Sequence, residues 1–235
     1  MEKVPKHPSF GDQLLKWWRV HGRRFPWRET RDPYKILISE VLLHRTRAEQ
    51  VAPVYLKFIE KYPDLNHLYV ASGDDVKRLL RTLGLDWRVR LLNKMVPEIV
   101  ERYGGKIPSS DSELETLPGV SRYISSAVRS FAFDQPDVLL DTNIVRVIGR
   151  LFGIPVIDGS RRSKRFADLY RKIVDRRSTR EFNYALIDLG ALVCRPKHPK
   201  CGQCPAAKIC QYATSEEVQP NASVIRSNLH QRHHA

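Results

Sequence analysis

The sequence predicts an all-α protein, and three observations support this prediction. Apolar residues recur every three or four positions along most of the chain, which is the period of amphipathic helices. Proline, glycine, serine and aspartate lie at the ends of these segments, where helices start and stop. No segment shows the alternating pattern of a β-strand. With 235 residues, the chain can bury a substantial core as one large domain or two interlocked ones.

The expected helices follow one another with short connections. The first carries an apolar stripe from Phe10 to Trp18 and ends at Gly22. The second is expected over residues 34–50, whose first half is unusually apolar and therefore predicts a buried helix. Further helices are expected over residues 51–62, 74–83, 87–103, 110–116, 121–133, 142–152, 163–174 and 180–193. No repeat period and no long linker interrupt this series.

The chain is strongly basic, with 40 Lys and Arg against 26 Asp and Glu, a net charge of +14. Arginines outnumber lysines by 26 to 14, which suits bidentate phosphate recognition and predicts a polyanionic partner. The alternative is a basic protein with solvated charged helices. The densest cluster, Arg161 to Arg180, is predicted to form one face of a helix, with Phe166, Leu169 and Tyr170 on the buried side.

The composition limits the class of protein. Apolar residues make up 42% and charged residues 28% of the chain, which excludes a mainly disordered or fibrous protein. No stretch approaches the length and apolarity of a membrane span, and the first ten residues lack the apolar core of a signal peptide. We therefore expect a cytoplasmic protein that is not secreted and contacts no membrane. Residues 213–235 are polar and are expected to form a flexible tail.

All four cysteines lie close together, in the pattern Cys194-x6-Cys201-x2-Cys204-x5-Cys210. Four thiolates in so short a segment predict a metal site of soft ligands. Zinc is the main alternative to iron and sulfur, but structural zinc sites usually pair two short knuckles, whereas here two long, unequal arms flank one. Disulfides are a weaker alternative, because a chain of this size does not need them.

A Pro-Gly turn separates two expected helices at Leu117-Pro118-Gly119-Val120-Ser121. Such a turn can direct the backbone N–H groups of Gly119 and Ser121, at the start of the following helix, toward a phosphate. A purely structural turn is the alternative.

Two acidic residues occupy unusual positions. Asp141 follows an apolar run and begins a helix with Thr142 and Asn143, so the helix dipole and backbone donors should keep it ionised at neutral pH. A simple helix N-cap is the alternative. Glu40 is the sole charge between residues 36 and 43, and is either paired with an arginine such as Arg45 or held in a pocket with a raised pKa.

Three of these motifs occur in a fixed order: Leu-Pro-Gly-Val-x-x-Tyr over residues 117–123, Asp-Thr-Asn-Ile-Val-Arg-Val over residues 141–147, and then the four cysteines. In this order the chain resembles the helix-hairpin-helix DNA glycosylases that carry a [4Fe-4S] cluster, the superfamily of endonuclease III and the MutY adenine glycosylases. Residues 25–28, 32–34 and 103–108 add to a resemblance that covers about residues 10–212.

The resemblance implies a two-lobed, all-helical fold with a C-terminal iron–sulfur cluster loop. Residues 1–24 and 136–212 would form the cluster lobe, and residues 25–135 a central domain with the helix-hairpin-helix. Cys194, Cys201, Cys204 and Cys210 would hold the [4Fe-4S] cluster. Double-stranded DNA with a mismatched or damaged base would bind between the lobes of a monomer associated with the nucleoid.

The resemblance also assigns catalytic roles. Asp141 matches the catalytic aspartate, whose carboxylate stabilises the oxocarbenium-like sugar and orients or deprotonates the attacking water. The lyase-capable members carry a lysine where this chain has Tyr123, so hydrolysis without a Schiff base is expected. Tyrosine at this position is similar to the thymine glycosylases that act on G:T and G:U pairs. Glu40, shared with the monofunctional groups, would contact or help protonate the flipped base.

Several residues are expected to contact DNA on the same basis. His44 or Arg45 would enter the gap left by the flipped base, and Leu85 and Trp87 would form a wedge beside the orphaned guanine. A half-buried anchor is the alternative for Trp87. Further DNA contacts are expected from Gly119, Ser121, Arg122 and Asn143. Because Ser121 stands where the family has glycine, its Cβ is expected to alter the phosphate contact or its hydroxyl to add to it.

The expected activity is therefore monofunctional removal of thymine or uracil opposite guanine. One alternative is an adenine glycosylase acting opposite 8-oxoguanine or guanine, although such enzymes normally add a C-terminal module. The other alternative is a non-catalytic module that binds damaged DNA.

Overall fold

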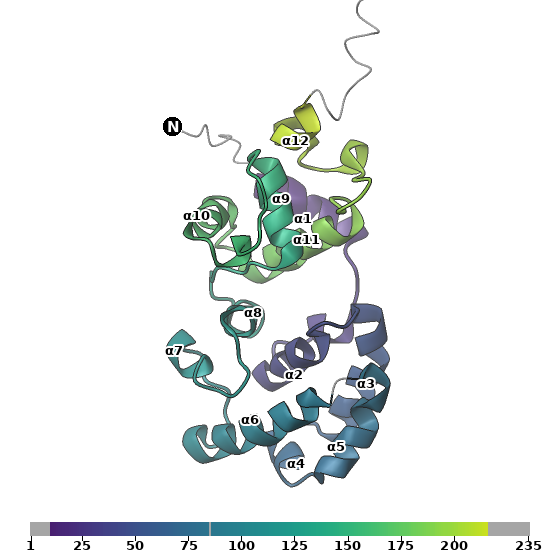
Figure 1. Cartoon of the computed structure of the whole chain (residues 1–235), viewed down its shortest axis with the longest axis vertical. Helices are drawn as coiled ribbons and strands as arrows, with labels where there is room; N and C mark the ends of the chain where they lie inside the picture. Colours follow the sequence, from purple (N-terminus) through teal and green to yellow (C-terminus); the bar gives the residue numbers. More distant parts are fainter. Residues whose placement is uncertain (1–9, 85, 216–235) are drawn as a thin grey trace, which may run out of the picture. The chain divides into compact units, whose positions relative to one another are not determined.

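A computed structural model describes residues 10–84 and 86–215, and every regular element in these ranges is a helix (Figure 1). The predicted all-α class is confirmed. The chain divides into two compact units. Residues 23–84, 86–139 and 176–180 form the first, which we call the hairpin unit. Residues 10–22, 140–175 and 181–215 form the second, the cysteine unit.

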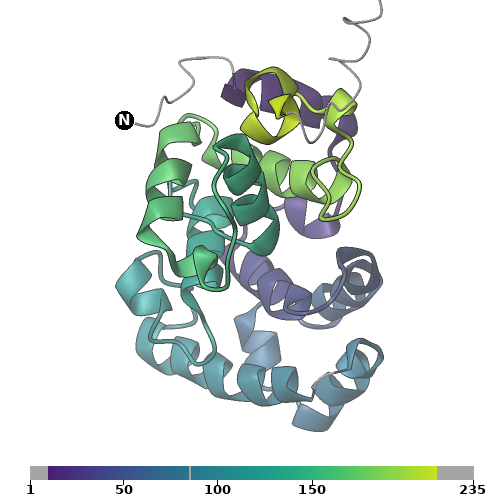
Figure 2. The same cartoon turned by 45° about the horizontal axis from the view of Figure 1, so that its top comes forward.

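The hairpin unit is built around the apolar helix α2 (Pro33–Leu43). Asp32 caps this helix, because its carboxylate accepts from the backbone N–H groups of Tyr34 and Lys35. Helix α2 packs against α8 and α3, and α6 packs against α4 and α5 (Figures 1 and 2). The other elements are η1 (Pro26–Arg28), α3 (Ala48–Lys61), α4 (Leu65–Tyr69), α5 (Gly73–Leu80), η2 (Arg81–Leu83), α6 (Trp87–Tyr103), α7 (Asp111–Leu114) and α8 (Arg122–Ala132).

The cysteine unit joins the beginning of the chain to its last helices. Helix α1 (Phe10–His21) packs on α11 (Thr179–Leu192): Phe10 meets Phe182 edge to face at 6.2 Å between ring centroids. The indole Nε1 of Trp18 donates to Asp188 at 3.0 Å. Helix α9 (Thr142–Leu151) packs against α10 (Lys164–Ile173) and α12 (Gln211–Thr214). Three short 3-10 turns complete the unit: η3 (Ser160–Arg162), η4 (Cys201–Gln203) and η5 (Ala207–Ile209).

The single helix predicted over residues 34–50 is wrong. Helix α2 ends at Leu43, and α3 begins only at Ala48. Between them Arg45 adopts a left-handed conformation with φ of 60°, which no continuous α-helix allows. Residues 44–47 include no proline or glycine, so the usual signals of a helix break are missing there.

The basic cluster from Arg161 to Arg180 is not one helical face. It spans η3, α10 and the start of α11. Phe166, Leu169 and Tyr170 are buried as predicted. Arg180, however, is only 5% exposed, and its guanidinium donates to the backbone carbonyls of Arg28, Thr30 and Phe131. This arginine therefore fixes the backbone of the hairpin unit and is not available to a phosphate.

In the part of the chain that the structure describes, no helix combines the length and the apolar character needed to cross a bilayer. The tail predicted over residues 213–235 lies outside the described residues from position 216 onward.

Candidate functional site

Asp141 is the N-cap of α9, in the cysteine unit. Its Oδ1 accepts from the backbone N–H of Ile144 at 2.6 Å, and its Oδ2 accepts from the side-chain amide of Asn143 at 3.1 Å. Both oxygens are therefore fixed by groups within the first turn of the same helix. The predicted helix-start position is confirmed, and the carboxylate has one orientation.

The pKa of Asp141 is raised, and burial of the carboxyl group is the main cause. Hydrogen bonds from Ile144 and Asn143 and the charge of Arg146 oppose this effect without cancelling it. The sequence led us to expect that helix-end donors would keep this acid ionised. The donors are present, but burial outweighs them, as it does in many catalytic carboxyl groups.

Arg146 supports the Asp141 site from one turn along α9. Its Nη2 donates to Asn143 Oδ1 at 2.8 Å and to the carbonyl of Gly190 at 2.7 Å, and its Nε donates to the carbonyl of Cys194 at 2.8 Å. The order of contacts is thus Asp141, Asn143, Arg146 and then the first cysteine. The catalytic candidate and the cysteine loop share one hydrogen-bond network.

Gly190 allows α11 to approach the start of α9 closely. A Cβ at this position would lie 2.6 Å from the Cβ of Asn143 and 3.3 Å from its Cα. Any larger residue would therefore push Asn143 away from α11. Because Asn143 holds Oδ2 of Asp141, the absence of a side chain at Gly190 is part of the geometry of the site.

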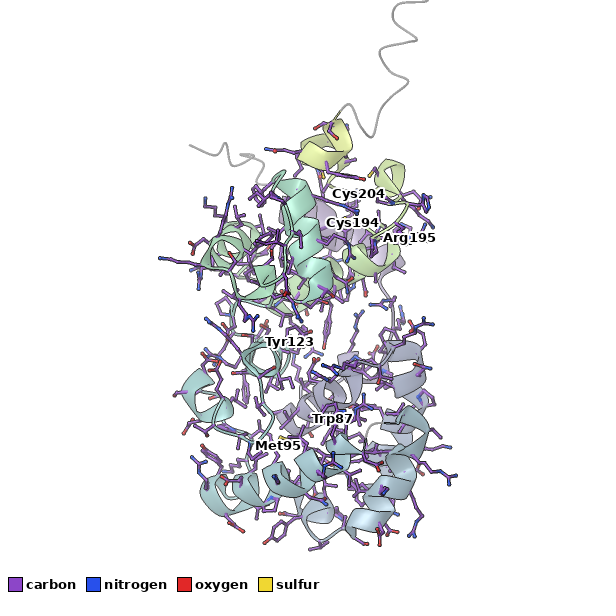
Figure 3. All side chains as sticks on the ribbon, viewed as in Figure 1. Trp87, Met95, Tyr123, Cys194, Arg195 and Cys204 are labelled. Atoms are coloured by element: carbon purple, nitrogen blue, oxygen red, sulfur yellow. The ribbon has the colours of Figure 1, made fainter. Side chains whose placement is uncertain are left out.

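The four cysteines follow α11, and Figure 3 labels Cys194 near the end of that helix and Cys204 in the loop beyond it. All four are free and half-buried. Burial raises the pKa of Cys204 to about 11, and it also raises the pKa of Cys201 and Cys210. Nearby Cys194 raises all three pKa values further, so the thiols lie close enough to interact.

This set of donors is chemically suited to a cation of soft character. Four partly buried thiols would repel one another as thiolates, and a bound metal removes that repulsion. Within residues 10–84 and 86–215, no group of three or more His, Cys, Asp or Glu side chains is arranged at ligand spacing. Arg150 lies against the loop and donates to Cys194 Sγ at 3.4 Å and to the carbonyl of Arg195 at 2.6 Å.

Glu40 and Tyr123 lie in the hairpin unit. Glu40 is buried on α2, with 7% of its surface exposed, and the residues around it in that helix are buried as well. Tyr123 is half-buried in the first turn of α8, the helix against which α2 packs (Figure 3).

The predicted phosphate-binding turn connects α7 to α8. Gly119 has φ of +75°, and a Cβ there would lie 2.0 Å from Leu91, so glycine is needed at this position. Ser121 has φ of −75°, which any residue adopts, and its hydroxyl accepts from the N–H of Ile124 at 3.3 Å as the cap of α8. Gly119, Ser121 and Arg122 are all exposed. Serine at position 121 therefore introduces no backbone strain.

Of the residues predicted to enter DNA, His44 and Arg45 lie in the break between α2 and α3, and Trp87 is the first residue of α6. The imidazole of His44 packs edge to face on Trp87, with ring centroids 5.1 Å apart, although the two residues are far apart in the sequence. Burial lowers the pKa of His44, and the charges of Arg45 and Arg88 lower it further. His44 and Arg45 are exposed and Trp87 is half-buried. Leu85, the other predicted wedge residue, lies outside the described residues.

Sequence reasoning missed three residues that support these groups: Arg88, Arg146 and Gly190. Arg146 lies three positions after Asn143 on a short helix, and this spacing is a usable signal for a side-chain pair. Gly190 has no local signal, because the residue that it approaches is distant in the sequence. Arg88 has none for its bonds to Val41, His44 and Thr46, which lie more than 40 positions away.

Comparison with known proteins assigns the family. Residues 38–172 match the model of the HhH-GPD superfamily base excision DNA repair proteins. The chain is 37% identical to a thymine-DNA glycosylase of Aeropyrum pernix over 87% of this chain and 94% of that protein. It is 35% identical to a thymine/uracil-DNA glycosylase of Methanothermobacter thermautotrophicus over 88% of this chain and 94% of that protein.

This chain matches a smaller share of its more distant relatives. An adenine DNA glycosylase of Buchnera aphidicola is 34% identical, and the chain spans 63% of that protein.

Solved structures agree with the sequence matches. A thermostable thymine-DNA glycosylase superposes with a TM-score of 0.80 at 35% identity, covering 87% of this chain and 94% of that one. Endonuclease III in a trapped covalent DNA complex gives 0.73 at 25% identity, covering 86% and 93%. The chain belongs to the HhH-GPD superfamily of base excision DNA repair proteins.

Proposed function

We propose that this protein is a monofunctional DNA glycosylase that removes thymine or uracil mispaired with guanine and leaves an abasic site in an uncut strand. The relatives that match it over nearly their whole length are named thymine or thymine/uracil glycosylases. The observation that carries the proposal is Asp141, a half-buried residue whose carboxyl group is fixed through both oxygens at a helix start and has a raised pKa.

The carboxylate of Asp141 acts on the sugar and on water. Loss of the base leaves positive charge on the deoxyribose, and an ionised carboxylate stabilises that charge. The same group orients the attacking water and accepts its proton. Because Ile144 and Asn143 already hold both oxygens, little reorganisation is needed as the charge develops.

Tyr123 makes the reaction hydrolytic. A Schiff base requires an amine nucleophile, and the phenol of Tyr123 cannot form one. We expect no covalent complex to be trapped when the protein, substrate DNA and borohydride are combined. Efficient trapping would contradict monofunctional action.

Glu40 is proposed to contact the flipped base. It is buried among apolar residues of α2, in the same unit as the loops that carry His44 and Trp87. A carboxyl group there can accept a hydrogen bond from the N3–H of thymine or uracil, or donate a proton to the departing base.

Cys194, Cys201, Cys204 and Cys210 are proposed to hold a [4Fe-4S] cluster, as the superfamily of endonuclease III commonly does. When bound, the cluster supplies four strong bonds that fix the loop after α11. Purified protein should contain about four iron atoms per chain and absorb visible light. Zinc without iron would contradict this assignment.

One experiment distinguishes the candidate substrates. Single-turnover assays on labelled duplexes with G:T, G:U and A:8-oxoguanine pairs should show release of thymine and uracil and none of adenine. Release of adenine alone would identify an adenine glycosylase. Tight binding to all three duplexes without release would identify a damage-binding module. Binding should weaken steeply with salt, because Lys and Arg contribute 40 charges against 26 acidic ones.

A further inference from the structure

Arg88 is a buried charge that has no acidic partner among the described residues. None of its surface is exposed, and burial lowers its pKa, with no charged neighbour acting in the other direction. A guanidinium ion remains protonated even so. A charge buried in this way costs stability unless hydrogen bonds satisfy every donor. Arg88 must therefore be understood through its hydrogen bonds.

All five N–H groups of Arg88 have an acceptor. Nε donates to the carbonyl of Val41 at 3.3 Å, and Nη1 donates to the carbonyls of Leu83 at 3.4 Å and Gly84 at 3.2 Å. Nη2 donates to the carbonyl of His44 at 2.6 Å and to the hydroxyl of Thr46. A guanidinium has five donors in a fixed plane, so this set of acceptors uses its full capacity.

The acceptors belong to two segments far apart in the sequence. One is the end of α2 and the break after it, and the other is the end of η2 before α6. The side chains that the resemblance to the DNA glycosylases predicts to enter DNA lie at these segments: His44 and Arg45 in the first, and Trp87 just beyond the second. The contact between the rings of His44 and Trp87 depends on the two segments staying together.

The strained backbone in the first segment needs this support. Arg45 has φ of 60°, which costs a residue other than glycine free energy that the surroundings must supply. Arg88 binds the carbonyl of the residue before it and the hydroxyl of the residue after it. The left-handed turn that exposes the side chain of Arg45 is thus held on both sides.

We propose that Arg88 is a positioning residue that joins these two loops into one rigid element and so presents His44, Arg45 and Trp87 to the space left by the flipped base. This inference rests on the proposed glycosylase function. It predicts that loss of Arg88 impairs the filling of the gap in the duplex more than it impairs hydrolysis itself.

The test compares two duplexes that differ only opposite the target. In one, uracil lies opposite guanine, and in the other, uracil lies opposite a tetrahydrofuran abasic analogue. The second duplex has no pair to break and no orphaned base to support, so the loop side chains contribute less there. Arg88→Met, which removes the charge and the donors at similar volume, is compared with wild type. Arg90→Met is the matched control, because Arg90 is an exposed arginine on the same helix.

We expect Arg88→Met to lower the single-turnover rate on the uracil–guanine duplex by about 10- to 100-fold. On the abasic-analogue duplex the fold-reduction in the rate of Arg88→Met should be about tenfold smaller. The affinity of this variant for undamaged DNA should equal that of wild type. Arg88→Lys should give an intermediate rate, because an ammonium has only three donors. A folded Arg88→Met protein with the wild-type rate, or with equal losses on both duplexes, would overturn the proposal.

A second variant keeps the test decisive if Arg88→Met fails to fold. Thr46→Val removes one acceptor of the five and leaves the guanidinium in place. Thr46→Val should lower the single-turnover rate more on the uracil–guanine duplex than on the abasic-analogue duplex, by a smaller factor than Arg88→Met. An equal reduction on both duplexes would overturn the proposal. Absence of uracil release by the wild type on either duplex would instead refute the proposed function, so the two failures are distinguishable.

Discussion

The two units hold their candidate functional groups by hydrogen bonds that differ in how far apart the partners lie in the sequence. In the cysteine unit, Asp141 is fixed by residues two and three positions further along the chain. In the hairpin unit, His44 is held by an arginine 44 positions away. The direct hydrogen bonds of the Asp141 carboxylate therefore come from one helix start, whereas the backbone at His44 is held through the folded core.

Each unit uses an arginine to satisfy backbone carbonyls, but the two arginines differ in what they stabilise. Arg146 is half-buried and reaches Asn143 as well as three carbonyls, so it supports a side-chain network around an acid. Arg88 is completely buried and binds four carbonyls and one hydroxyl, so it fixes the path of the backbone. Mutations in the first unit should change chemistry, and mutations in the second should change DNA engagement.

Asp141→Asn should have the largest effect. The amide keeps the shape and the N-cap but carries no charge and accepts no proton, so base release should fall by about 10²- to 10⁴-fold. Binding to a G:T duplex should persist, as measured by gel mobility shift. Asp168→Asn, which removes an exposed carboxylate of α10, is the control and should retain activity. Full activity of Asp141→Asn would remove this residue from its proposed role.

Gly190→Ala tests whether the acid depends on the approach of α11. The new Cβ would meet Asn143 at 2.6 Å, so Asn143 must move and Oδ2 of Asp141 must lose or change its contact. A shift of about 1 Å is expected to reduce the single-turnover rate by up to about 100-fold. Gly11→Ala is the matched control in the same unit, because its Cβ would lie 3.6 Å from the nearest atom. Equal rates for the two variants would show that the close approach does not position the acid.

The raised pKa of Asp141 predicts two pH effects. The rate of base release should fall with decreasing pH as the carboxyl group takes up its proton, at a pH above that of an exposed aspartate. The free energy of unfolding should instead rise as pH falls, because a pKa that is higher in the folded than in the unfolded state means that the folded protein binds the proton more tightly. The melting temperature of wild type minus that of Asp141→Asn should therefore increase as pH falls through that pKa. A difference independent of pH would contradict the raised value.

The sequence predicted helices well where their ends carry their own signals. The expected segment 87–103 coincides with α6, because Gly104 ends that helix in a left-handed conformation. The expected segment 34–50 failed because its break lacks proline and glycine and is held by Arg88, a contact that no local pattern contains. Local signals therefore predict helix ends made by local contacts and miss those made by distant ones.

The same limit applies to the candidate site. The position of Asp141 at a helix start followed from the apolar run before it, and the structure confirms that position. The raised pKa did not follow, because burial depends on groups outside the helix. The pairing of His44 with Trp87 and the need for glycine at position 190 are also long-range, and each required the folded chain to be seen.

Ser121 should show the smallest effect, and it tests the local side of this comparison. Its hydroxyl caps α8, so Ser121→Ala should lower the free energy of unfolding by about 1 kcal/mol. Ser121→Gly should lower it by only about a few tenths of a kcal/mol. Because φ is −75°, glycine offers no conformational advantage, and neither variant should change the affinity for duplex DNA by more than about twofold. Urea unfolding and DNA titration measure the two quantities, with Ser109→Ala as an exposed control. A marked gain in DNA affinity for Ser121→Gly would show that the serine side chain obstructs the phosphate after all.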